Sequence, residues 1–401
     1  MDLNFIKNLK KYSNKKIVFL IIDGLGGLAE KSNDLTELES AKTPNLDFLA
    51  ADGICGLHQP VGAGITPGSG PGHLSIFGYD PMNYKVGRGV LAALGINFDL
   101  QKNDVAVRGN FCTINENGLV LDRRAGRIST EENIKLCKLL SKINLPDIEV
   151  FIKPVKEHRF LLVFRGDKLN PNICDTDPQD IGLKPVSPKS LSKESDYTSV
   201  IAKKFIEEAA IILKDQYPAN MILLRGFSKK PNLPTLHENF GLNSASIACY
   251  PMYKGISRLL GMKILDGGKT IDSEFNELEK NWNEFDFFYI HIKGSDSAGE
   301  DGDFERKVKV IEELDKNIPR LLNLKPDVIV ITGDHSTPSI MKYHSWHPVP
   351  VILWSKYCRK DDVKHFGEKD CIKGGLGPRF PAVDLMPLAL ANAKKLEKYG
   401  A

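Results

Sequence analysis

Ile17-Val-Phe-Leu-Ile-Ile22 is a short, apolar, largely β-branched run that ends at a carboxylate, Asp23. Three further runs of the same character stand at Phe287–Ile292, at Val328–Thr332 and at residues 349–354. Runs of this length, bounded by polar or turn-forming residues, are typical of buried sheet strands. We therefore expect these four segments to form the centre of one sheet.

Helical patterns lie between the apolar runs. Residues 43–51 form one candidate helix and residues 304–322 form another. In the second, apolar side chains recur every three or four residues, at Val308, Ile311, Leu314 and Ile318. Strands that alternate with helices predict a mainly parallel sheet of the α/β class.

The segment between about residue 103 and about residue 231 has strand and helix patterns of its own. Its strand candidates are residues 108–114, 119–121, 160–165 and 221–224, and its helix candidates are residues 131–141 and 199–213. Because elements of the outer unit lie on both sides, we expect a discontinuous catalytic domain, residues 1–102 and 232–401, with an inserted smaller α/β domain, residues 103–231. Residues 171–188 are expected to be a long functional loop.

Composition excludes several classes of protein. The 401 residues are 42% hydrophobic, and 54 basic and 51 acidic residues are interspersed, so the net charge is only +3. There is no long block of one charge of the kind that binds nucleic acid or membranes. Seven scattered cysteines without a CxxC pair argue against a disulfide framework or a zinc knuckle. The run Ile17–Ile22 is too short for a signal peptide's core or a membrane span, so we expect a cytoplasmic protein.

Carboxylates follow three of the four expected strands. Asp23 directly follows the first, Asp296 lies four residues beyond the second, and Asp334 with His335 follows the third. Open α/β sheets form their sites at the carboxyl ends of strands, where these side chains would gather. A single such aspartate is more often a cap or turn residue, but three strands that end this way favour a metal site. Carboxylate and imidazole ligands together suit Mn²⁺, Zn²⁺, Fe²⁺ or Co²⁺.

A nucleophile is offered by the glycine-rich segment Gly62-Ala-Gly-Ile-Thr-Pro-Gly-Ser-Gly-Pro-Gly-His-Leu74. Ser69 lies in it just before an expected helix at residues 71–77, and its flanking glycines would let the backbone approach a phosphate closely. A metal bound to the hydroxyl would lower the pKa of the serine and activate it without a histidine base. A flexible loop is the alternative interpretation. His73 is expected to support the turn rather than react.

Several short motifs, in their order and spacing, resemble the alkaline phosphatase superfamily over nearly the whole chain. They are Ile-Ile-Asp23-Gly, Thr43-Pro-Asn-Leu46, Gly-Ser69-Gly-Pro-Gly-His-Leu, Gly333-Asp-His335 and His344-Ser-Trp-His-Pro-Val-Pro350. The Ser69 segment together with Gly78-Tyr-Asp-Pro81 resembles the archaeal-type branch of 2,3-bisphosphoglycerate-independent phosphoglycerate mutases. The resemblance implies an alkaline-phosphatase-like fold, in which helices flank the sheet.

The resemblance also implies two divalent metal ions. One would be held by Asp23, Ser69, Asp334 and His335, and the other by Asp296, His344 and the residue four after Asp296. That residue is Glu300, where the superfamily pattern Asp-x-x-x-His has a histidine. Glutamate is a harder ligand, so we expect Mn²⁺ or Mg²⁺ ahead of Co²⁺ or Zn²⁺. His347 is the alternative third ligand, and we favour Glu300.

The inserted segment supplies cationic side chains that could hold a small anion in forked geometry. The candidates are Arg108, Arg123, Arg127, His158, Arg159 and Arg225. Each arginine alone is more often a solvated surface residue, although Arg225 directly follows an apolar strand. Asp122 is a candidate acid or base at the substrate hydroxyls, and Asp175 is either a turn residue or a second such group. Lys254 resembles the position of a cationic phosphate contact in the related enzymes.

The function implied by the resemblance is that of an isomerase of glycolysis and gluconeogenesis. It would interconvert 3-phosphoglycerate and 2-phosphoglycerate through a phosphoserine at Ser69, without 2,3-bisphosphoglycerate. The alternative is a metal-dependent phosphatase or a phosphotransferase acting on another small metabolite, such as homoserine phosphate. A third hypothesis, a metal-stabilised scaffold, leaves an exposed serine in a glycine turn without a use. The sequence predicts no oligomeric state.

Overall fold

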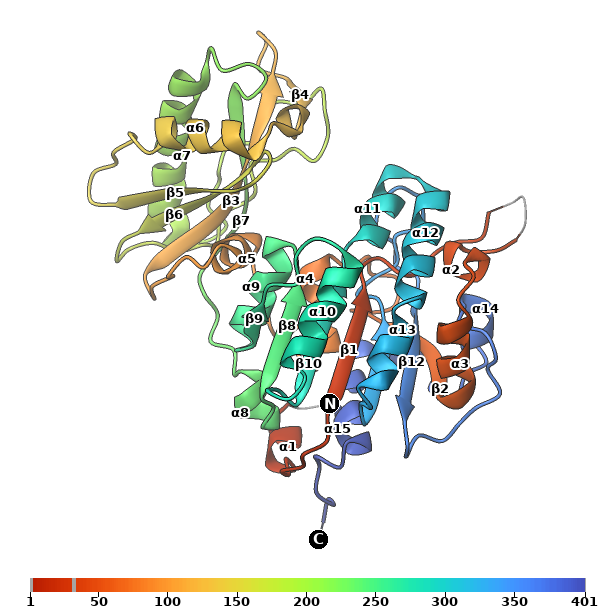
Figure 1. Cartoon of the computed structure of the whole chain (residues 1–401). Helices are drawn as coiled ribbons and strands as arrows, with labels where there is room; N and C mark the ends of the chain where they lie inside the picture. The colour runs from red at the N-terminus through yellow and green to blue at the C-terminus, as the bar shows by residue number, and fades with distance from the viewer. Residues whose placement is uncertain (1–2, 31–33, 401) are drawn as a thin grey trace. The chain divides into compact units, whose positions relative to one another are not determined.

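The computed structural model describes residues 3–30 and 34–400, and its contacts divide the chain into two compact units (Figure 1). The first unit contains Met1–Lys85 and Leu233–Ala401, and the second contains Val86–Asn232. The two separate stretches of the first unit are joined by one sheet, to which both contribute strands.

One eight-stranded sheet runs through the first unit, in the order β13-β2-β12-β11-β1-β10-β8-β9. Strand β1 pairs in parallel with both β10 and β11, whereas β12 is antiparallel to both of its neighbours. The strands are β1 (Ile17–Ile22), β2 (Ile54–Gln59), β8 (Ser244–Ala248), β9 (Lys263–Leu265), β10 (Phe287–Ile292), β11 (Val328–Thr332), β12 (Val349–Ser355) and β13 (Gly377–Pro381). The predicted mainly parallel α/β sheet is confirmed.

The four strands expected from the apolar runs are all present. Strands β1, β10 and β11 have the expected bounds, and β12 is one residue longer than expected. Strands β2 and β8 were not predicted, because Ile54–Gln59 contains glycine, histidine and glutamine, and Ser244–Ala248 consists mostly of small residues. Their burial comes from pairing inside the sheet, which composition does not reveal.

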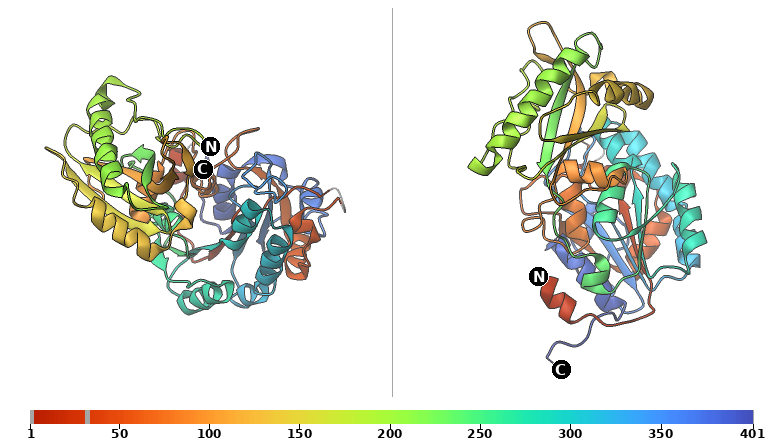
Figure 2. Two further views of the ribbon diagram at one scale, coloured as in Figure 1. Left: turned by 90° about the horizontal axis from the view of Figure 1, so that it is seen from above. Right: turned by 90° about the vertical axis from the view of Figure 1, so that its left-hand side faces the viewer.

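Helices cover both faces of this sheet (Figures 1 and 2). They are α1 (Leu3–Asn8), α2 (Glu37–Ser40), α3 (Pro44–Asp52), α4 (Ser69–Ile76), α8 (Leu236–Phe240), α9 (Pro251–Leu259), α10 (Ile271–Asn281), α11 (Gly294–Asp301), α12 (Phe304–Asp315), α13 (Ile318–Asn323), α14 (Glu368–Cys371) and α15 (Leu385–Asn392), with a 3-10 turn at Ala382–Asp384. Because both faces are covered, β1, β10 and β11 are buried at every position and consist largely of apolar residues.

The two faces of the sheet pack differently. Helices α3, α10, α12 and α13 pack against the face that carries Val18, Leu20 and Ile22 of β1. On the opposite face, Phe19 of β1 stacks with Phe77, just beyond α4, at a centroid separation of 6.5 Å. Adjacent residues of β1 therefore point into opposite cores, as the alternation of a strand requires.

The expectation of one helix over residues 304–322 is wrong. Helix α12 ends at Asp315, and α13 begins at Ile318. Pro319 has no N–H to donate to the carbonyl of Asp315, which breaks the helical ladder at this point. The freed carbonyl of Asp315 accepts a hydrogen bond from the side-chain amide of Asn45, at 3.1 Å. The Asp315 carboxylate accepts from the backbone N–H groups of Asn45 and Leu46 at the start of α3, the latter at 2.8 Å.

The second unit contains a five-stranded antiparallel sheet, in the order β4-β3-β6-β5 with β7 paired to β3. Its elements are α5 (Arg88–Gly95), β3 (Asp104–Ile114), β4 (Val120–Asp122), a 3-10 turn (Ala125–Arg127), α6 (Thr130–Leu140), β5 (Glu149–Lys156), β6 (Arg159–Arg165), a 3-10 turn (Lys193–Ser195), α7 (Asp196–Leu213) and β7 (Met221–Ser228). Helices α6 and α7 share one hydrophobic core with the sheet. Residues 171–188 contain no helix or strand, as expected.

The second unit begins before the segment 103–231 that the sequence suggested. Helix α5 belongs to it because its backbone lies against β3: a Cβ added at Gly89 would stand 2.1 Å from the carbonyl oxygen of Ala106. The N–H of Val90 also donates to the hydroxyl of Ser228, at 3.2 Å. Only glycine permits this approach, and the sequence pattern alone gave no sign of it.

Glu274 is a buried carboxyl group in the first turns of α10, and it is not one of the candidate site residues. Its side chain is only 3% exposed, and burial raises its pKa from 4.5 to about 8. The folded protein therefore holds a proton that the unfolded chain releases above about pH 4.5. This raised pKa favours the folded state below that pH, and the contribution is lost as the pH rises towards 8.

Replacing Glu274 by glutamine should remove this pH dependence. At pH 5 we expect Glu274→Gln and the wild type to have similar free energies of unfolding. At pH 8 the variant should be more stable by a few kcal/mol, at about 1.4 kcal/mol per unit of pKa shift. Urea unfolding at both pH values measures the difference. A variant whose advantage is the same at pH 5 and pH 8 would show that Glu274 ionises normally in the folded protein.

Candidate active site

Asp23 lies directly after β1 and is completely buried. The next residue, Gly24, has a φ of +66° and turns the chain so that its N–H donates to Oδ1 of Asp334, at 3.2 Å. Oδ2 of Asp23 accepts a hydrogen bond from the hydroxyl of Tyr253 and lies 3.0 Å from Nζ of Lys293. Oδ1 has no hydrogen-bond donor among the described residues, which leaves one buried oxygen free.

Asp334 and His335 follow β11, the strand next to β1, and both are completely buried. Oδ2 of Asp334 is also without a donor in the described part of the chain. His73 lies close, with Nδ1 at 3.1 Å, but this nitrogen donates to the carbonyl of Ser69, at 2.8 Å. Nε2 of His335 lies 3.4 Å from Oδ1 of Asp23 and 3.3 Å from Oδ2 of Asp334. Three potential ligand atoms therefore converge.

Ser69 is the first residue of α4, so the predicted helix begins two residues earlier than expected. Pro71 is compatible with this start, because the first backbone N–H groups of a helix have no partner within it. The hydroxyl of Ser69 lies 3.2 Å from Nε2 of His335. Helix α4 reaches this place because position 72 is glycine: a Cβ there would stand 2.2 Å from the carbonyl oxygen of Asp334.

A second convergence of ligand atoms involves Asp296, His335 and His344. Nε2 of His344 lies 3.6 Å from Oδ1 of Asp296, and the rings of His344 and His335 stack with a centroid separation of 3.6 Å. Nδ1 of His344 donates to the carbonyl of Pro67, at 2.9 Å, which turns Nε2 towards the carboxylate. Oδ1 of Asp296 accepts a hydrogen bond from the hydroxyl of Thr337, at 2.8 Å.

These residues form two groups that could hold metal ions. The ligand atoms of Asp23, Asp334 and His335 lie within 4.8 Å of one another, as do those of Asp296, His335 and His344. The unpartnered oxygens of Asp23 and Asp334 fit this role, since a buried carboxylate oxygen without a donor is unfavourable unless a cation or a hydrogen bond compensates it. Oxygen and imidazole donors together match a divalent transition metal.

Glu300 and His347 lie outside both groups. Glu300 is on α11, four residues after Asp296, and is exposed. His347 is half-buried, and its Nδ1 lies 2.9 Å from the hydroxyl of Ser345. Among the described residues, His335 is therefore the imidazole that stands next to both Asp296 and His344.

The charges of the site favour ionised carboxylates and a neutral imidazole. Burial by itself would raise the pKa of Asp23, but the positive charge of Lys293 and contacts with His291 hold it well below the ordinary value. The pKa of Asp334 is likewise lowered, against the effect of burial and of Asp23, by His335 and His73. Burial lowers the pKa of His335 more than the neighbouring carboxylates raise it. A neutral histidine is the form that binds a metal.

Three supporting side chains were missed by the sequence analysis. His291 and Lys293 stand two residues apart at the end of β10, so both project from the same face of the chain towards Asp23. Tyr253, from α9, stacks on the ring of His291 with a centroid separation of 3.6 Å and donates to Asp23. The signal for the first two was a histidine inside an otherwise apolar strand and a lysine two residues later, directly after that strand. Lys254, the residue after Tyr253, is half-buried on α9.

In the second unit, arginines gather around a buried carboxylate that was not singled out. Asp177 is 4% exposed and accepts two hydrogen bonds from Arg123, both at 2.8 Å. Arg225 lies 3.2 Å from the same carboxylate and 3.7 Å from Asp175. Asp175 in turn accepts a hydrogen bond from the N–H of Gly226, at 2.7 Å. Asp177 lies two residues after the predicted Asp175, in the segment Asp175-Thr-Asp-Pro178.

The remaining predicted residues of the second unit lie on β3, β6 and the turn after β4. Arg108 lies on β3 opposite Arg225 of β7, and Arg159 begins β6 opposite Asn110 of β3. His158, just before β6, is buried. Burial and the nearby arginines, Arg159 first, lower the pKa of His158 to about 3. Asp122 accepts backbone hydrogen bonds from Arg124 and Gly126, at 2.7 and 2.6 Å, and so closes the turn that carries Arg127.

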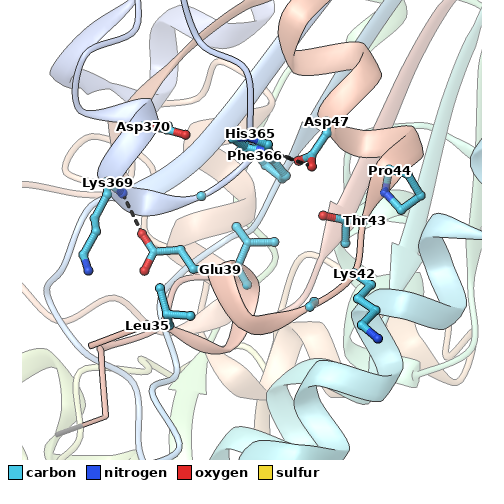
Figure 3. A pocket seen from close by; sticks show the side chains of 13 residues that line it. Leu35, Glu39, Lys42, Thr43, Pro44, Asp47, His365, Phe366, Lys369 and Asp370 are labelled. Carbon is cyan, nitrogen blue, oxygen red and sulfur yellow. Dashed lines mark hydrogen bonds and ion pairs between the residues drawn. The ribbon is translucent and has the colours of Figure 1, made fainter. Parts of the chain in front are cut away.

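A pocket of about 490 Å³ lies elsewhere in the first unit, between α2, the start of α3 and α14 (Figure 3). Two of its carboxylates have partners within the lining: Glu39 accepts from the backbone N–H of Lys369, at 2.9 Å, and Asp47 contacts Nδ1 of His365, at 3.0 Å. None of the predicted site residues lines it.

In the described part of the chain, no helix has the length and apolar character needed to cross a bilayer.

The fold is of the α/β class, and its mixed sheet carries two groups of potential metal ligands beyond the carboxyl ends of its strands. Residues 50–220 match the family model described as 2,3-bisphosphoglycerate-independent phosphoglycerate mutase. A protein of Aquifex aeolicus, described as a probable enzyme of this kind, is 50% identical over the full length of both chains. The chain belongs to the family of 2,3-bisphosphoglycerate-independent phosphoglycerate mutases and is an isomerase.

Solved structures agree with this assignment. A protein from Pyrococcus horikoshii is 31% identical, with a TM-score of 0.83, and the match covers 98% of this chain and 100% of that one. The cofactor-independent phosphoglycerate mutase of Thermoplasma acidophilum is 30% identical, with a TM-score of 0.68, and the match covers 94% of this chain and 100% of that one.

A divalent cation should stabilise the first unit, because it would compensate the free oxygens of Asp23 and Asp334. Saturation with Mn²⁺ should raise the melting temperature, and a ligand at 100 times its Kd contributes about 2.7 kcal/mol. Asp334→Asn should greatly reduce this shift. The matched control is Asp327→Asn, which alters a carboxylate at the other end of β11 that pairs with Lys15. Equal shifts in Asp334→Asn and the wild type, measured by scanning fluorimetry, would contradict the assignment.

Proposed function

We propose that this enzyme interconverts 3-phosphoglycerate and 2-phosphoglycerate through a phosphoserine at Ser69. The observation that carries the proposal is the position of the Ser69 hydroxyl, 3.2 Å from Nε2 of His335 and at the first turn of α4. A nucleophile placed there stands beside potential metal ligands, while the N-terminus of the helix favours the negative charge of a phosphoryl group. The proposed reaction belongs to glycolysis and gluconeogenesis in the cytoplasm.

The proposal includes two divalent ions, Mn²⁺ or Mg²⁺ ahead of Co²⁺ or Zn²⁺, and no 2,3-bisphosphoglycerate. One would be held by Asp23, Ser69, Asp334 and His335, and the other by Asp296, His344 and Glu300. When bound, such ions lower the pKa of a serine hydroxyl and neutralise the charge of the phosphoryl group. The unpartnered oxygens of Asp23 and Asp334 support the first set, and the contact between Asp296 and His344 supports the second.

The chain's own residues would then orient and retain the reacting groups. We assign Lys254 to the phosphoryl group, whose charge an ammonium can balance during transfer. Transfer back to the same glycerate requires that the glycerate stays bound, and we assign this to Arg108, Arg123, Arg127, His158, Arg159 and Arg225, with Asp175. Asp177 supports this assignment, because it holds Nε and Nη2 of Arg123 in a forked geometry while Nη2 also donates to Gln179, which leaves the N–H groups of Nη1 for a carboxylate.

Asp122 is given a different role from the one expected from the sequence. Both of its carboxylate oxygens accept backbone N–H groups, so the residue is committed to its turn. We propose that it positions Arg127 and does not transfer a proton.

Turnover and covalent trapping test the mutase proposal together. Wild-type enzyme with Mn²⁺ should convert 3-phosphoglycerate to 2-phosphoglycerate, followed through enolase, without added 2,3-bisphosphoglycerate. Ser69→Ala should lose at least about 10³-fold in kcat, because the nucleophile is absent. Ser75→Ala, a buried serine on the same helix, is the matched control and should remain active.

Three outcomes of this experiment distinguish the candidate functions. Phosphate release that equals substrate loss would identify a phosphatase. Inactivity on phosphoglycerate with turnover of another phosphorylated metabolite, such as homoserine phosphate, would identify a phosphotransferase. Full activity of Ser69→Ala, or failure to trap a phosphoserine from labelled substrate, would exclude the proposed intermediate.

Glu300 can be tested separately, because it is exposed and its neutral variant should fold. Asp296 and Glu300 are four residues apart on α11 and so share one face of the helix. We expect Glu300→Gln to weaken Mn²⁺ binding, measured by titration calorimetry, by about tenfold or more, since one carboxylate ligand is lost. Glu305→Gln, an exposed carboxylate in the first turn of α12, is the control and should bind as the wild type does. Identical Mn²⁺ affinities of Glu300→Gln and Glu305→Gln would assign the second site to Asp296, His335 and His344 alone.

A further inference from the structure

A completely buried lysine donates hydrogen bonds to two loops that carry candidate metal ligands. Lys307, on α12, has no exposed surface. Its ammonium donates hydrogen bonds to the carbonyls of Gly26, at 3.1 Å, and Thr337, at 2.9 Å. Its charge is balanced by Glu37, whose Oε1 lies 3.6 Å away and which is equally buried. The three N–H bonds of the ammonium thus face two carbonyls and one carboxylate.

The two carbonyls belong to the two loops that carry the first group of candidate ligands. Gly26 lies three residues after Asp23, and Thr337 lies two residues after His335. The loops also bond directly, since the N–H of Thr337 points to the carbonyls of Gly26 and Gly24, at 3.0 and 3.3 Å. Lys307 lies where the two loops meet and donates a hydrogen bond to each of them.

Thr337 connects this junction to the second group of candidate ligands. Its hydroxyl donates to Oδ1 of Asp296, at 2.8 Å, and lies 3.0 Å from Nδ1 of His335. A shift of the Thr337 backbone would therefore move the partner of Asp296 and the neighbour of His335 together. The bond from Lys307 fixes the carbonyl of this same residue.

Glu37 holds the far end of the same loop. Its Oε1 accepts a hydrogen bond from the N–H of Ser339, at 2.7 Å. Oε2 has no hydrogen-bond partner among the described residues, and a Cβ added at Gly27 would stand 2.0 Å from it. Glu37 therefore fits against the first loop at Gly27 while it holds the second at Ser339.

The packing leaves these loops little room to move independently. A Cβ at Gly26 would stand 1.9 Å from the hydroxyl of Ser336, and one at Gly299 would stand 2.2 Å from the carbonyl oxygen of Thr337. Contacts this close require that the backbones stay in one register. An ion pair taken out of water contributes little net stability, and an apolar pair of similar size often serves equally well for that purpose. An apolar pair, however, could not bind two carbonyls.

We propose that Lys307 and Glu37 are positioning residues that fix the separation of the two ligand loops and thereby set the affinity for divalent metal. The inference rests on the proposed function, because it requires that Asp23, Asp334 and His335 bind an ion. Neither residue belongs to the two groups of candidate metal ligands; both act through the backbone of residues 26, 337 and 339.

The double variant Lys307→Met/Glu37→Gln tests the inference. It removes both charges and nearly preserves volume, whereas either single change would leave an unpaired buried charge. With the fold verified by circular dichroism, titration calorimetry should show Mn²⁺ binding weaker by about 10- to 100-fold, as when groups that orient metal ligands are removed. The Mn²⁺ concentration for half-maximal activity should rise by the same factor, while KM for 3-phosphoglycerate at saturating Mn²⁺ should stay unchanged.

A matched pair in the same unit separates positioning from general stability. Lys395 is also buried; its ammonium donates to the carbonyl of Ser13, at 2.6 Å, and pairs with Asp286, at 3.0 Å. Asp286 precedes β10 and so lies at the opposite end of the strand from Asp296. Lys395→Met/Asp286→Asn should change thermal stability but bind Mn²⁺ as the wild type does.

The outcomes are distinguishable. A folded Lys307→Met/Glu37→Gln protein with wild-type Mn²⁺ affinity would overturn the inference and leave the proposed function intact. A wild-type protein that binds no Mn²⁺ would overturn the proposed function and the inference with it. If the double variant does not fold, Lys307→Arg keeps the charge but displaces the two carbonyls, and it should also weaken binding; wild-type affinity in this folded variant would equally overturn the inference.

Discussion

The structure depends on the burial of three carboxylates, which carry the same charge, beyond the carboxyl ends of three adjacent strands. Strands β11, β1 and β10 are adjacent, and each leads at its carboxyl end to an aspartate that is almost completely buried: Asp334, Asp23 and Asp296. Unpaired carboxylates in such a place are strongly unfavourable, because burial removes their hydration and each repels the others. The surrounding residues can be understood as the compensation that makes this arrangement possible.

Compensation comes first from side chains that reach the carboxylates directly. The ammonium of Lys293 contacts both Asp23 and Asp296, so one cation joins the two candidate metal groups. Tyr253 donates to Asp23, and Thr337 donates to Asp296. These donors satisfy some of the carboxylate oxygens and leave one oxygen of Asp23 and one of Asp334 free. The oxygens left free are the ones that a divalent ion would need.

A second layer of compensation acts on the backbone. Loops that place aspartates close together must themselves pack closely, and glycines at positions 26, 72 and 299 make this possible. Close packing fixes the loops only if their polar backbone groups also find partners. Lys307 and Glu37 supply those partners from α12 and α2. The same requirement, that no buried polar group stays unpaired, thus links the helices of the fold to the geometry of the site.

The amino-acid sequence by itself determined the centre of the fold and indicated which residues could take part in the chemistry. Four apolar runs located β1, β10, β11 and β12, since strands buried on both faces need continuous apolar sequence. Aspartates after three of these strands, and a serine between glycines, identified Asp23, Asp296, Asp334 and Ser69. The resemblance of the motifs to a known family, which the comparisons bear out, extended this to the class of enzyme.

Only the tertiary structure decided which side chains support those residues. These side chains come from three elements: Tyr253 from α9, His291 and Lys293 from the end of β10, and Lys307 from α12. Their roles arise from contacts between segments far apart in the sequence. The same is true of Asp177 among the arginines, and of α5, which the close approach at Gly89 and the hydrogen bond from Val90 to Ser228 join to the second unit. The local pattern of apolar and polar residues indicates how a segment is buried and where the chain turns. It does not report which distant partner satisfies a buried charge, because that depends on how the folded chain brings such segments together.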